Sequence, residues 1–235
     1  MVSVEKWPSR RWRSGLIGLR LARGRDDIVQ VLCLGAHSDD IEIGCGGTLL
    51  FLKKLFPRLK FHWVVLSAAG VRGEEATKAA ELFTAGCEKQ VALKEFRDGF
   101  LPYDASQVKS FFEEMKAHIT PDLIFTQWGG DAHQDHRLLS ELTWNTFRNH
   151  TILEYEIPKY DGDMGRPNLF VPLEAPLCEQ KIGNLLLAFA SQRSKKWFEP
   201  ETFRGLMRLR GMECNAPSGY AEAFYARKML LHPAD

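Results

Sequence analysis

The sequence has no pair of cysteines at the spacing of a structural zinc site or a redox motif. Its five cysteines are scattered along 235 residues and never form a Cys-x-x-Cys pair. This pattern favours reduced, mostly buried thiols in a cytoplasmic protein. The cysteines are Cys33, Cys45, Cys87, Cys178 and Cys214.

The sequence also has no long apolar run and no excess of charge of one sign. No segment approaches the roughly 20 apolar residues of a transmembrane helix. Basic and acidic side chains number 31 and 30, so the formal net charge is +1 and nothing global indicates nucleic acid as a partner. With 45% hydrophobic residues, the chain suits one compact domain that is large enough to carry a pocket.

Charge is uneven only at the start of the chain. The first 25 residues contain Glu5 as their only acid, against seven lysines and arginines. We therefore expect a basic N-terminal arm, residues 1–27, followed by a single domain, residues 28–235. The apolar patches in this arm are too short for a signal peptide, which favours a solvated arm over one that contacts an anionic membrane surface.

Strand and helix patterns alternate along the domain. Residues 28–34 form a continuous apolar run, which is typical of a strand buried on both faces. The alternation predicts an α/β fold with a mainly parallel sheet flanked by helices. The expected strands are 28–34, 61–66, 91–96, 123–126 and 221–230, and the expected helices are 46–56, 74–85, 106–118 and 174–192, with a long loop over 155–172.

Two polar clusters follow expected strands, at the sheet edge where ligands bind in such folds. The first contains His37 and Asp40, three residues apart on a turn before a glycine-rich helix start. Catalytic zinc takes a few nitrogen and oxygen ligands, so both side chains are expected to reach one ion. Asp39 then remains off the metal, where it can accept a proton from a water molecule.

The second cluster contains His133, Asp135 and His136 and precedes a helical pattern. His136 is the simplest third ligand, which leaves a fourth position open as in catalytic zinc sites. Taken singly, Asp131 and Asp135 are more typical of helix caps. Metal binding is favoured because both clusters pair histidine with aspartate at the same edge of the expected sheet.

The first cluster resembles the His-Pro-Asp-Asp motif region of the PIG-L/LmbE-like deacetylase family. The similar residues are Gly-Ala-His-Ser-Asp-Asp-Ile-Glu-Ile-Gly-Cys-Gly-Gly-Thr-Leu at 35–49, and His-Gln-Asp-His at 133–136 resembles the second motif, His-x-Asp-His. Similarity extends over about 28–148, with a fainter match near 220–224. Ser38 stands where proline is usual in the family, which is expected to loosen the turn without removing a ligand.

The resemblance implies a Rossmann-like fold and a zinc ion held by His37, Asp40 and His136. It further implies that Asp39 is the general base and that His133, as imidazolium, stabilises the oxyanion. Asp135 is then expected to orient His133 and favour its charged form. Either Asp39 or His133 protonates the leaving amine.

Contacts to the substrate are expected from four residues on the rim. Arg72 and Glu75 match the family's rim arginine and acid, although an ion pair at a helix start explains them equally well. Asp98 fits a loop that binds sugar hydroxyls in the family, and an Asp-Gly pair is also a common turn. Trp128, beside two glycines, is a candidate for stacking on a sugar ring.

These observations predict a hydrolase that uses Zn²⁺ to remove the N-acetyl group from an amino sugar, either free, nucleotide-linked or lipid-linked. Fe²⁺ suits the same ligands. One alternative is a non-haem iron oxygenase that uses His133 and Asp135, but the strand–helix alternation disfavours it. The other is a non-catalytic sugar-binding module, which would not require Asp39.

Overall fold

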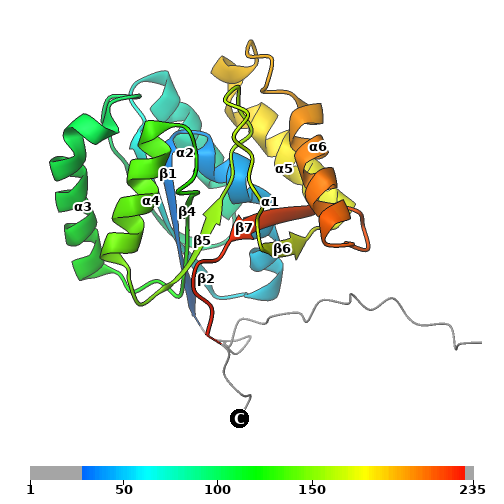
Figure 1. The fold of residues 1–235 in the computed structure, drawn as a ribbon, viewed down its shortest axis with the longest axis horizontal. Coiled ribbons are helices and arrows are strands. Elements are labelled where there is room, and N and C mark those ends of the chain that lie inside the picture. Colours follow the sequence, from blue (N-terminus) through cyan, green and yellow to red (C-terminus); the bar gives the residue numbers. More distant parts are fainter. Residues whose placement is uncertain (1–27, 231–235) are drawn as a thin grey trace, which may run out of the picture.

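The computed structural model describes residues 28–230, which form a seven-stranded sheet with helices on both faces (Figure 1). The expected basic arm, residues 1–27, lies outside the described residues. The strands are β1 (Val29–His37), β2 (Leu59–Ser67), β3 (Glu88–Leu93), β4 (Leu123–Gln127), β5 (Thr151–Tyr155), β6 (Leu169–Pro172) and β7 (Ala221–Tyr225). The helices are α1 (Asp40–Leu55), α2 (Val71–Thr84), α3 (Ala105–His118), α4 (Gln134–Thr146), α5 (Ala175–Ala188) and α6 (Pro200–Glu213), with short 3-10 helices at Leu101–Asp104 and Ala190–Gln192.

The order of the strands fixes where a ligand can bind. The order of strands in the sheet is β3-β2-β1-β4-β5-β7-β6. The first five strands in this order are parallel, and β7 is antiparallel to both of its neighbours. The chain builds outward from β1 to β3 and then returns to place β4 on the other side of β1. The order therefore reverses between β1 and β4, and the crevice at such a point is where open α/β sheets bind ligands.

Both faces of the sheet are buried, as the apolar run of β1 predicts. Val31 and Cys33 pack in the core with α1, α2, α5 and α6, whereas Leu32 and Leu34 pack with α3 and α4. Figure 1 shows α3 and α4 together on one side and α5 and α6 on the other. Between residues 28 and 230, no helix combines the length and apolar content that a membrane span requires.

The α/β fold and the mainly parallel sheet are confirmed, and several elements differ from expectation. α1 begins at Asp40, six residues before the expected start. The strands β5 and β6 and the helix α6 were not anticipated, and β6 lies within the segment expected to be a loop. The last strand ends at Tyr225 rather than at residue 230.

The glycines of α1 explain its early start, because they let the helix pack closely against the sheet. A Cβ atom on Gly44 would lie 2.0 Å from the ring of Tyr155, and one on Gly47 would lie 2.5 Å from Leu173. The carboxylate of Glu222 accepts the backbone N–H groups of Gly47 and Thr48 at 2.8 and 2.6 Å. These contacts hold α1 close to the sheet, and the first turn of the helix carries Asp40 near β1 and β4.

Candidate metal centre

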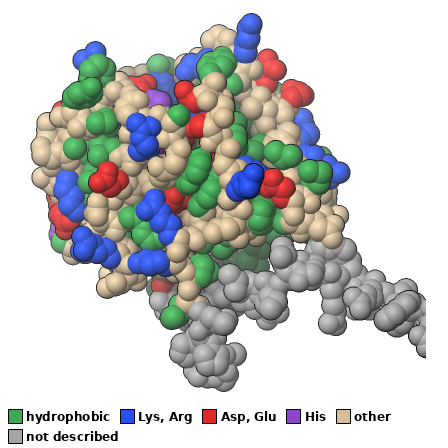
Figure 2. Space-filling view, viewed as in Figure 1, with side chains coloured by type: hydrophobic (Ala, Val, Ile, Leu, Met, Phe, Trp, Pro, Cys, Tyr) green, Lys and Arg blue, Asp and Glu red, His purple; other side chains and the backbone are tan. Residues whose placement is uncertain are grey.

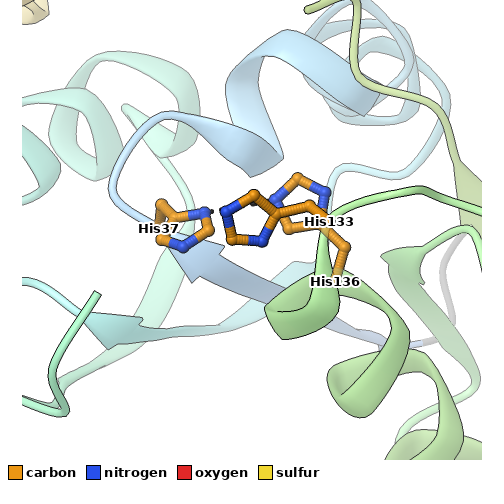
Figure 3. Close-up of side chains that lie close together, drawn as sticks. All are labelled: His37, His133 and His136. Carbon is orange, nitrogen blue, oxygen red and sulfur yellow. Dashed lines mark hydrogen bonds between the residues drawn. The ribbon is translucent and has the colours of Figure 1, made fainter. Parts of the chain in front are cut away.

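The two polar clusters meet at the carboxyl ends of β1 and β4. Figure 3 shows the rings of His37, His133 and His136 converging from these two loops. His37 ends β1, whereas His136 lies in the first turn of α4. The Nδ1 atom of His37 is 3.1 Å from Nε2 of His136, although the two residues are 99 positions apart in the sequence.

Donor atoms of three side chains gather around a common point between these loops. Oδ2 of Asp40 lies 3.4 Å from Nδ1 of His37, and Oδ1 of Asp40 lies 3.5 Å from Nε2 of His136. A tetrahedral zinc with bonds of about 2.0–2.1 Å holds its ligand atoms about 3.3–3.4 Å apart. The three separations, which involve both oxygens of Asp40, are close to this spacing, so the donor set fits a divalent ion.

His133 also contributes to the cluster. A nitrogen from each of His37, His133 and His136 lies within 4.8 Å of the others, and a second overlapping group contains His37, Asp98, His133 and Asp135. Asp40 belongs to neither group, but one of its oxygens lies 3.4 Å from His37 and the other lies 3.5 Å from His136, and its carboxylate carries a charge opposite to that of a metal ion.

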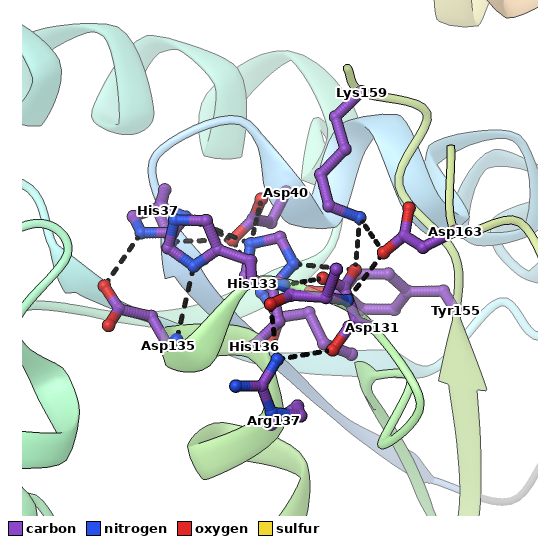
Figure 4. A network of polar contacts seen from close by, with 12 residues as sticks. His37, Asp40, Asp131, His133, Asp135, His136, Arg137, Tyr155, Lys159 and Asp163 are labelled. Carbon is purple, nitrogen blue, oxygen red and sulfur yellow. Dashed lines mark hydrogen bonds and ion pairs between the residues drawn. The ribbon is translucent and has the colours of Figure 1, made fainter. Parts of the chain in front are cut away.

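Each of the two histidines has a carboxylate on its outer nitrogen. Nε2 of His37 is 3.2 Å from Asp135, and Nδ1 of His136 is 2.9 Å from Asp131 (Figure 4). If each outer nitrogen donates its proton, Nδ1 of His37 and Nε2 of His136 carry free lone pairs directed at the common point. Metal-binding histidines are usually oriented in this way.

The Asp40 carboxylate is also held in place. Its Oδ2 atom accepts the backbone N–H of His37 at 2.7 Å and the side-chain amide of Gln127 at 2.5 Å. The Asp40 and Gln127 side chains are both buried. Gln127, at the end of β4, was not anticipated, although its position at the carboxyl end of a central strand was a usable signal.

The charges of the cluster shift the pKa values of its members. Burial lowers the pKa of His136, but the neighbouring Asp40 and Asp131 raise it to about 9. Burial likewise lowers the pKa of His37, yet Asp40 and the other carboxylates hold it well above its usual value. Burial raises the pKa of Asp40, but the two histidines hold it well below its usual value. The surroundings thus stabilise positive charge, which a divalent ion can supply in place of protons.

Asp39, the residue before Asp40, makes an ion pair. Its Oδ1 atom is 2.8 Å from the guanidinium of Arg72, which also contacts Glu75 at 2.8 Å. Glu75 in turn accepts the backbone N–H and the hydroxyl of Ser191, both at 2.7 Å. Burial raises the pKa of Asp39 above its usual value, although Arg72 acts in the opposite direction.

The contacts of His133 and Asp135 differ from those expected. The Asp135 carboxylate accepts the N–H groups of Gly99 and Leu101 at 2.7 and 3.1 Å, and its Oδ2 atom lies 3.2 Å from Nε2 of His37. It is the backbone N–H of Asp135 that donates to Nδ1 of His133, at 3.2 Å. Burial lowers the pKa of His133, as do His136 and His37, whereas the Asp135 and Asp40 carboxylates act in the opposite direction. Because Nδ1 accepts a hydrogen bond, a neutral His133 ring carries its proton on Nε2.

The remaining predicted rim residues lie at different places. Asp98 is 78% exposed, and its Oδ1 is 3.1 Å from Nε2 of His37. Trp128 stacks on Tyr225 at a centroid distance of 4.5 Å, so one face of its ring is already covered. Ser38 is buried, and its hydroxyl donates to the carbonyl of Ser67 at 3.4 Å, a contact that a proline at this position would lack.

A further carboxyl lies beneath the cluster. Glu42 is fully buried, and neither of its oxygens has a hydrogen-bond partner within the described part of the chain. Burial raises its pKa well above the usual value, and Asp39 and Asp40 add to this shift. Glu42 is therefore favoured as a neutral acid, which limits the negative charge under the site.

The comparisons with known proteins agree with this geometry. The model of the PIG-L family, GlcNAc-PI de-N-acetylase, matches residues 32–147, a range that contains both clusters. The chain belongs to the PIG-L/LmbE-like deacetylase family. The uncharacterized deacetylase YaiS of Escherichia coli strain K12 is 29% identical over 139 residues, which cover 54% of this chain and 74% of that protein.

Solved structures share the fold of this PIG-L family member. The conserved protein TT1542 from Thermus thermophilus has a TM-score of 0.67 at 21% identity, covering 87% of this chain and 97% of that chain. The N,N'-diacetylchitobiose deacetylase from Pyrococcus horikoshii has a TM-score of 0.63 at 20% identity, covering 83% and 82%. The hydratase GalB from Pseudomonas putida KT2440 has a TM-score of 0.64 at 16% identity, covering 88% and 99%, so this fold also carries other chemistry.

Proposed function

We propose that this PIG-L family enzyme uses zinc to remove the N-acetyl group from an amino sugar or a sugar conjugate, releasing acetate and a free amine. The observation that carries the proposal is the triangle of side chains His37, Asp40 and His136: the two histidine nitrogens lie 3.1 Å apart, and each lies within 3.5 Å of one oxygen of Asp40. When bound there, zinc would supply a water of pKa about 7 and polarise the amide carbonyl.

Asp39 is proposed as the general base. It lies next to Asp40 but outside the triangle, and it is 6% exposed, so it can approach the attacking water from one side. A carboxyl whose pKa is raised by burial is better matched to proton transfer near neutral pH than an exposed one. The same group can then return the proton to the leaving amine.

His133 is proposed to donate a hydrogen bond from its Nε2–H group to the developing oxyanion. Its Nδ1 accepts from the backbone N–H of Asp135, which orients the ring, and its lowered pKa keeps the ring neutral. A neutral donor still stabilises negative charge in the transition state. A neutral His133 is also a poor proton source for the amine, which supports Asp39 in that role.

The sugar is proposed to lie against the side of the site formed by Arg72, Glu75 and Asp98. Arg72 keeps partial exposure while it bridges Asp39 and Glu75, so a substrate hydroxyl near this arginine would sit close to the base. The family description and the chitobiose deacetylase support an N-acetylated sugar as the substrate class. Trp128 can offer only its free ring face.

The test is acetate release from a panel of N-acetylhexosamine substrates, free, nucleotide-linked and lipid-linked, by protein loaded with Zn²⁺ or Fe²⁺. We expect acetate from at least one member, and no acetate after chelation. Metal binding without acetate from any substrate would contradict the proposal. Oxygen consumption with a 2-oxo acid would instead support the oxygenase, although the backbone contacts of Asp135 disfavour it as a metal ligand.

A further inference from the structure

Lys159 lies next to the metal centre, although no sequence motif marks it. It follows β5, in the segment that passes beside the loop between β4 and α4, and its side chain is only 11% exposed. Its Nζ atom is 2.9 Å from Oδ2 of Asp131 and 2.6 Å from Oδ2 of Asp163 (Figure 4). One ammonium group thus neutralises part of two carboxylates.

The Asp131 oxygen that Lys159 contacts is also the one that faces His136. Oδ2 of Asp131 lies 2.9 Å from Nδ1 of His136, whereas Oδ1 accepts a hydrogen bond from the backbone N–H of His133 at 2.7 Å. Asp131 is 2% exposed, so water has little access to replace any of these contacts. Lys159 and His136 therefore share the negative charge of a single buried oxygen atom.

Asp163 completes the arrangement. Its Oδ2 atom accepts Nζ of Lys159 and the backbone N–H of Ala132, the latter at 2.6 Å. The charge of Lys159 is therefore divided between Asp131 and Asp163. A change at either Lys159 or Asp163 alters how much of the Asp131 charge is left for His136, and the two changes act in opposite directions.

We propose that Lys159 is a positioning residue that limits the negative charge which Asp131 lends to His136, and thereby sets the affinity of the metal centre. A carboxylate on the outer nitrogen makes a histidine a stronger ligand. A cation on the same oxygen weakens that effect. The inference rests on the proposed metal centre and assigns to it a residue that sets its affinity for the metal ion.

The experiment measures the affinity for Zn²⁺ by competition with a chelator, together with the visible spectrum of the Co²⁺-loaded protein. Removal of a direct outer partner typically changes metal affinity 10- to 100-fold. Since Lys159 is one contact further out, we expect Lys159→Met to bind Zn²⁺ about threefold to tenfold more tightly and to shift the Co²⁺ bands. Lys159→Arg, which keeps the charge, should restore both readouts.

Asp163→Asn should change the affinity for Zn²⁺ in the opposite direction. It leaves an oxygen for the Ala132 N–H but directs the whole Lys159 charge to Asp131, so we expect weaker Zn²⁺ binding. Lys78→Met is the matched control, because Lys78 donates to the Leu187 carbonyl at 2.7 Å, away from this network. It should change the affinity less than twofold.

The outcomes separate the possibilities. Weaker binding by Lys159→Met would mean that the lysine only holds the loop in shape, and unchanged binding would mean that it has no influence on the metal; either result overturns the inference. Measurements in 1 M salt, where the Debye length is about 3 Å, should preserve the effect if it acts through the buried contacts. Unmodified protein that binds no metal would contradict the proposed function instead.

Discussion

Replacement of Asp39 by asparagine is the sharpest test of the proposed chemistry. The change keeps the shape of the side chain and leaves an oxygen that can still accept from Arg72. It removes the ability to accept a proton. Because Asp39 stands outside the triangle of His37, Asp40 and His136, we expect Asp39→Asn to keep its metal and lose turnover.

The size of the loss follows from the role of a general base. A positioned base contributes about 10²- to 10⁴-fold, which corresponds to about 3–5 kcal/mol in the activation free energy. We expect the loss in kcat, since Arg72 retains its contact to Glu75 and the sugar-binding side of the site remains in place.

The substitution should not lower the stability of the folded state. Burial raises the pKa of Asp39 above its value in an unfolded chain. The stability of the folded state therefore decreases as the pH rises from the pKa of Asp39 in the unfolded chain to its higher pKa in the folded chain. Above that pH Asp39 is ionised in both states, and the loss of stability remains. Asparagine removes that cost, so the Tm of Asp39→Asn at pH 7 should equal or exceed that of the unmodified protein.

Three measurements on one sample decide the outcome: acetate release, bound metal by mass spectrometry, and Tm. Asp161→Asn, at an exposed aspartate, is the control and should leave all three unchanged. Full turnover by Asp39→Asn with metal bound would show that Asp39 is not the base. Loss of the metal would show that Asp39 supports the ion rather than the proton transfer.

Three further predictions follow from contacts within the fold. Gln127→Met should lower Zn²⁺ affinity about 10- to 100-fold, because Asp40 loses its amide donor; unchanged affinity in a chelator competition would contradict this role. Zn²⁺ binding at pH 7 should release protons, since His37 and His136 have raised pKa values, and a titration in weak buffer measures this release. The apparent affinity for Zn²⁺ should increase as the pH rises toward about 9. Gly44→Ala should lower Tm, because overpacking costs about 1–3 kcal/mol and about 1 kcal/mol corresponds to about 2–4 °C in a domain of this size. Gly183→Ala is the control and should leave Tm unchanged, because no atom lies within 4 Å of the added Cβ.

The sequence predicts that the two polar clusters meet, because the signals for this meeting are local. His37 and Asp40 follow a strand whose apolar run is unmistakable, and His136 follows a second one. Parallel strands place their carboxyl ends at one edge, so the meeting of the two loops could be expected before any distance was known. The ligand set and the base that the sequence indicates stay a proposal.

What sequence could not supply is the set of contacts made across loops. Asp135 was expected to orient His133, yet its carboxylate is held by the backbone of residues 99–101 and faces His37. Lys159 reaches Asp131 only because the segment after β5 passes beside the second cluster. The early start of α1 was missed for another reason: glycine at Gly44 normally disfavours a helix, but here it permits close approach to Tyr155.

The concentration of buried carboxyl groups finally suggests that metal and stability are linked. Asp40, Asp131 and Asp135 are each at most 3% exposed, and in the metal-free chain the raised pKa values of His37 and His136 provide compensating protons. An ion that binds the folded state alone stabilises it by about 4 kcal/mol at 1,000 times its Kd. Saturating Zn²⁺ should therefore raise Tm by about 8–16 °C, at about 2–4 °C per kcal/mol. His37→Ala, which removes a donor, should lose most of this increase, and an equal increase in that variant would place the ion elsewhere.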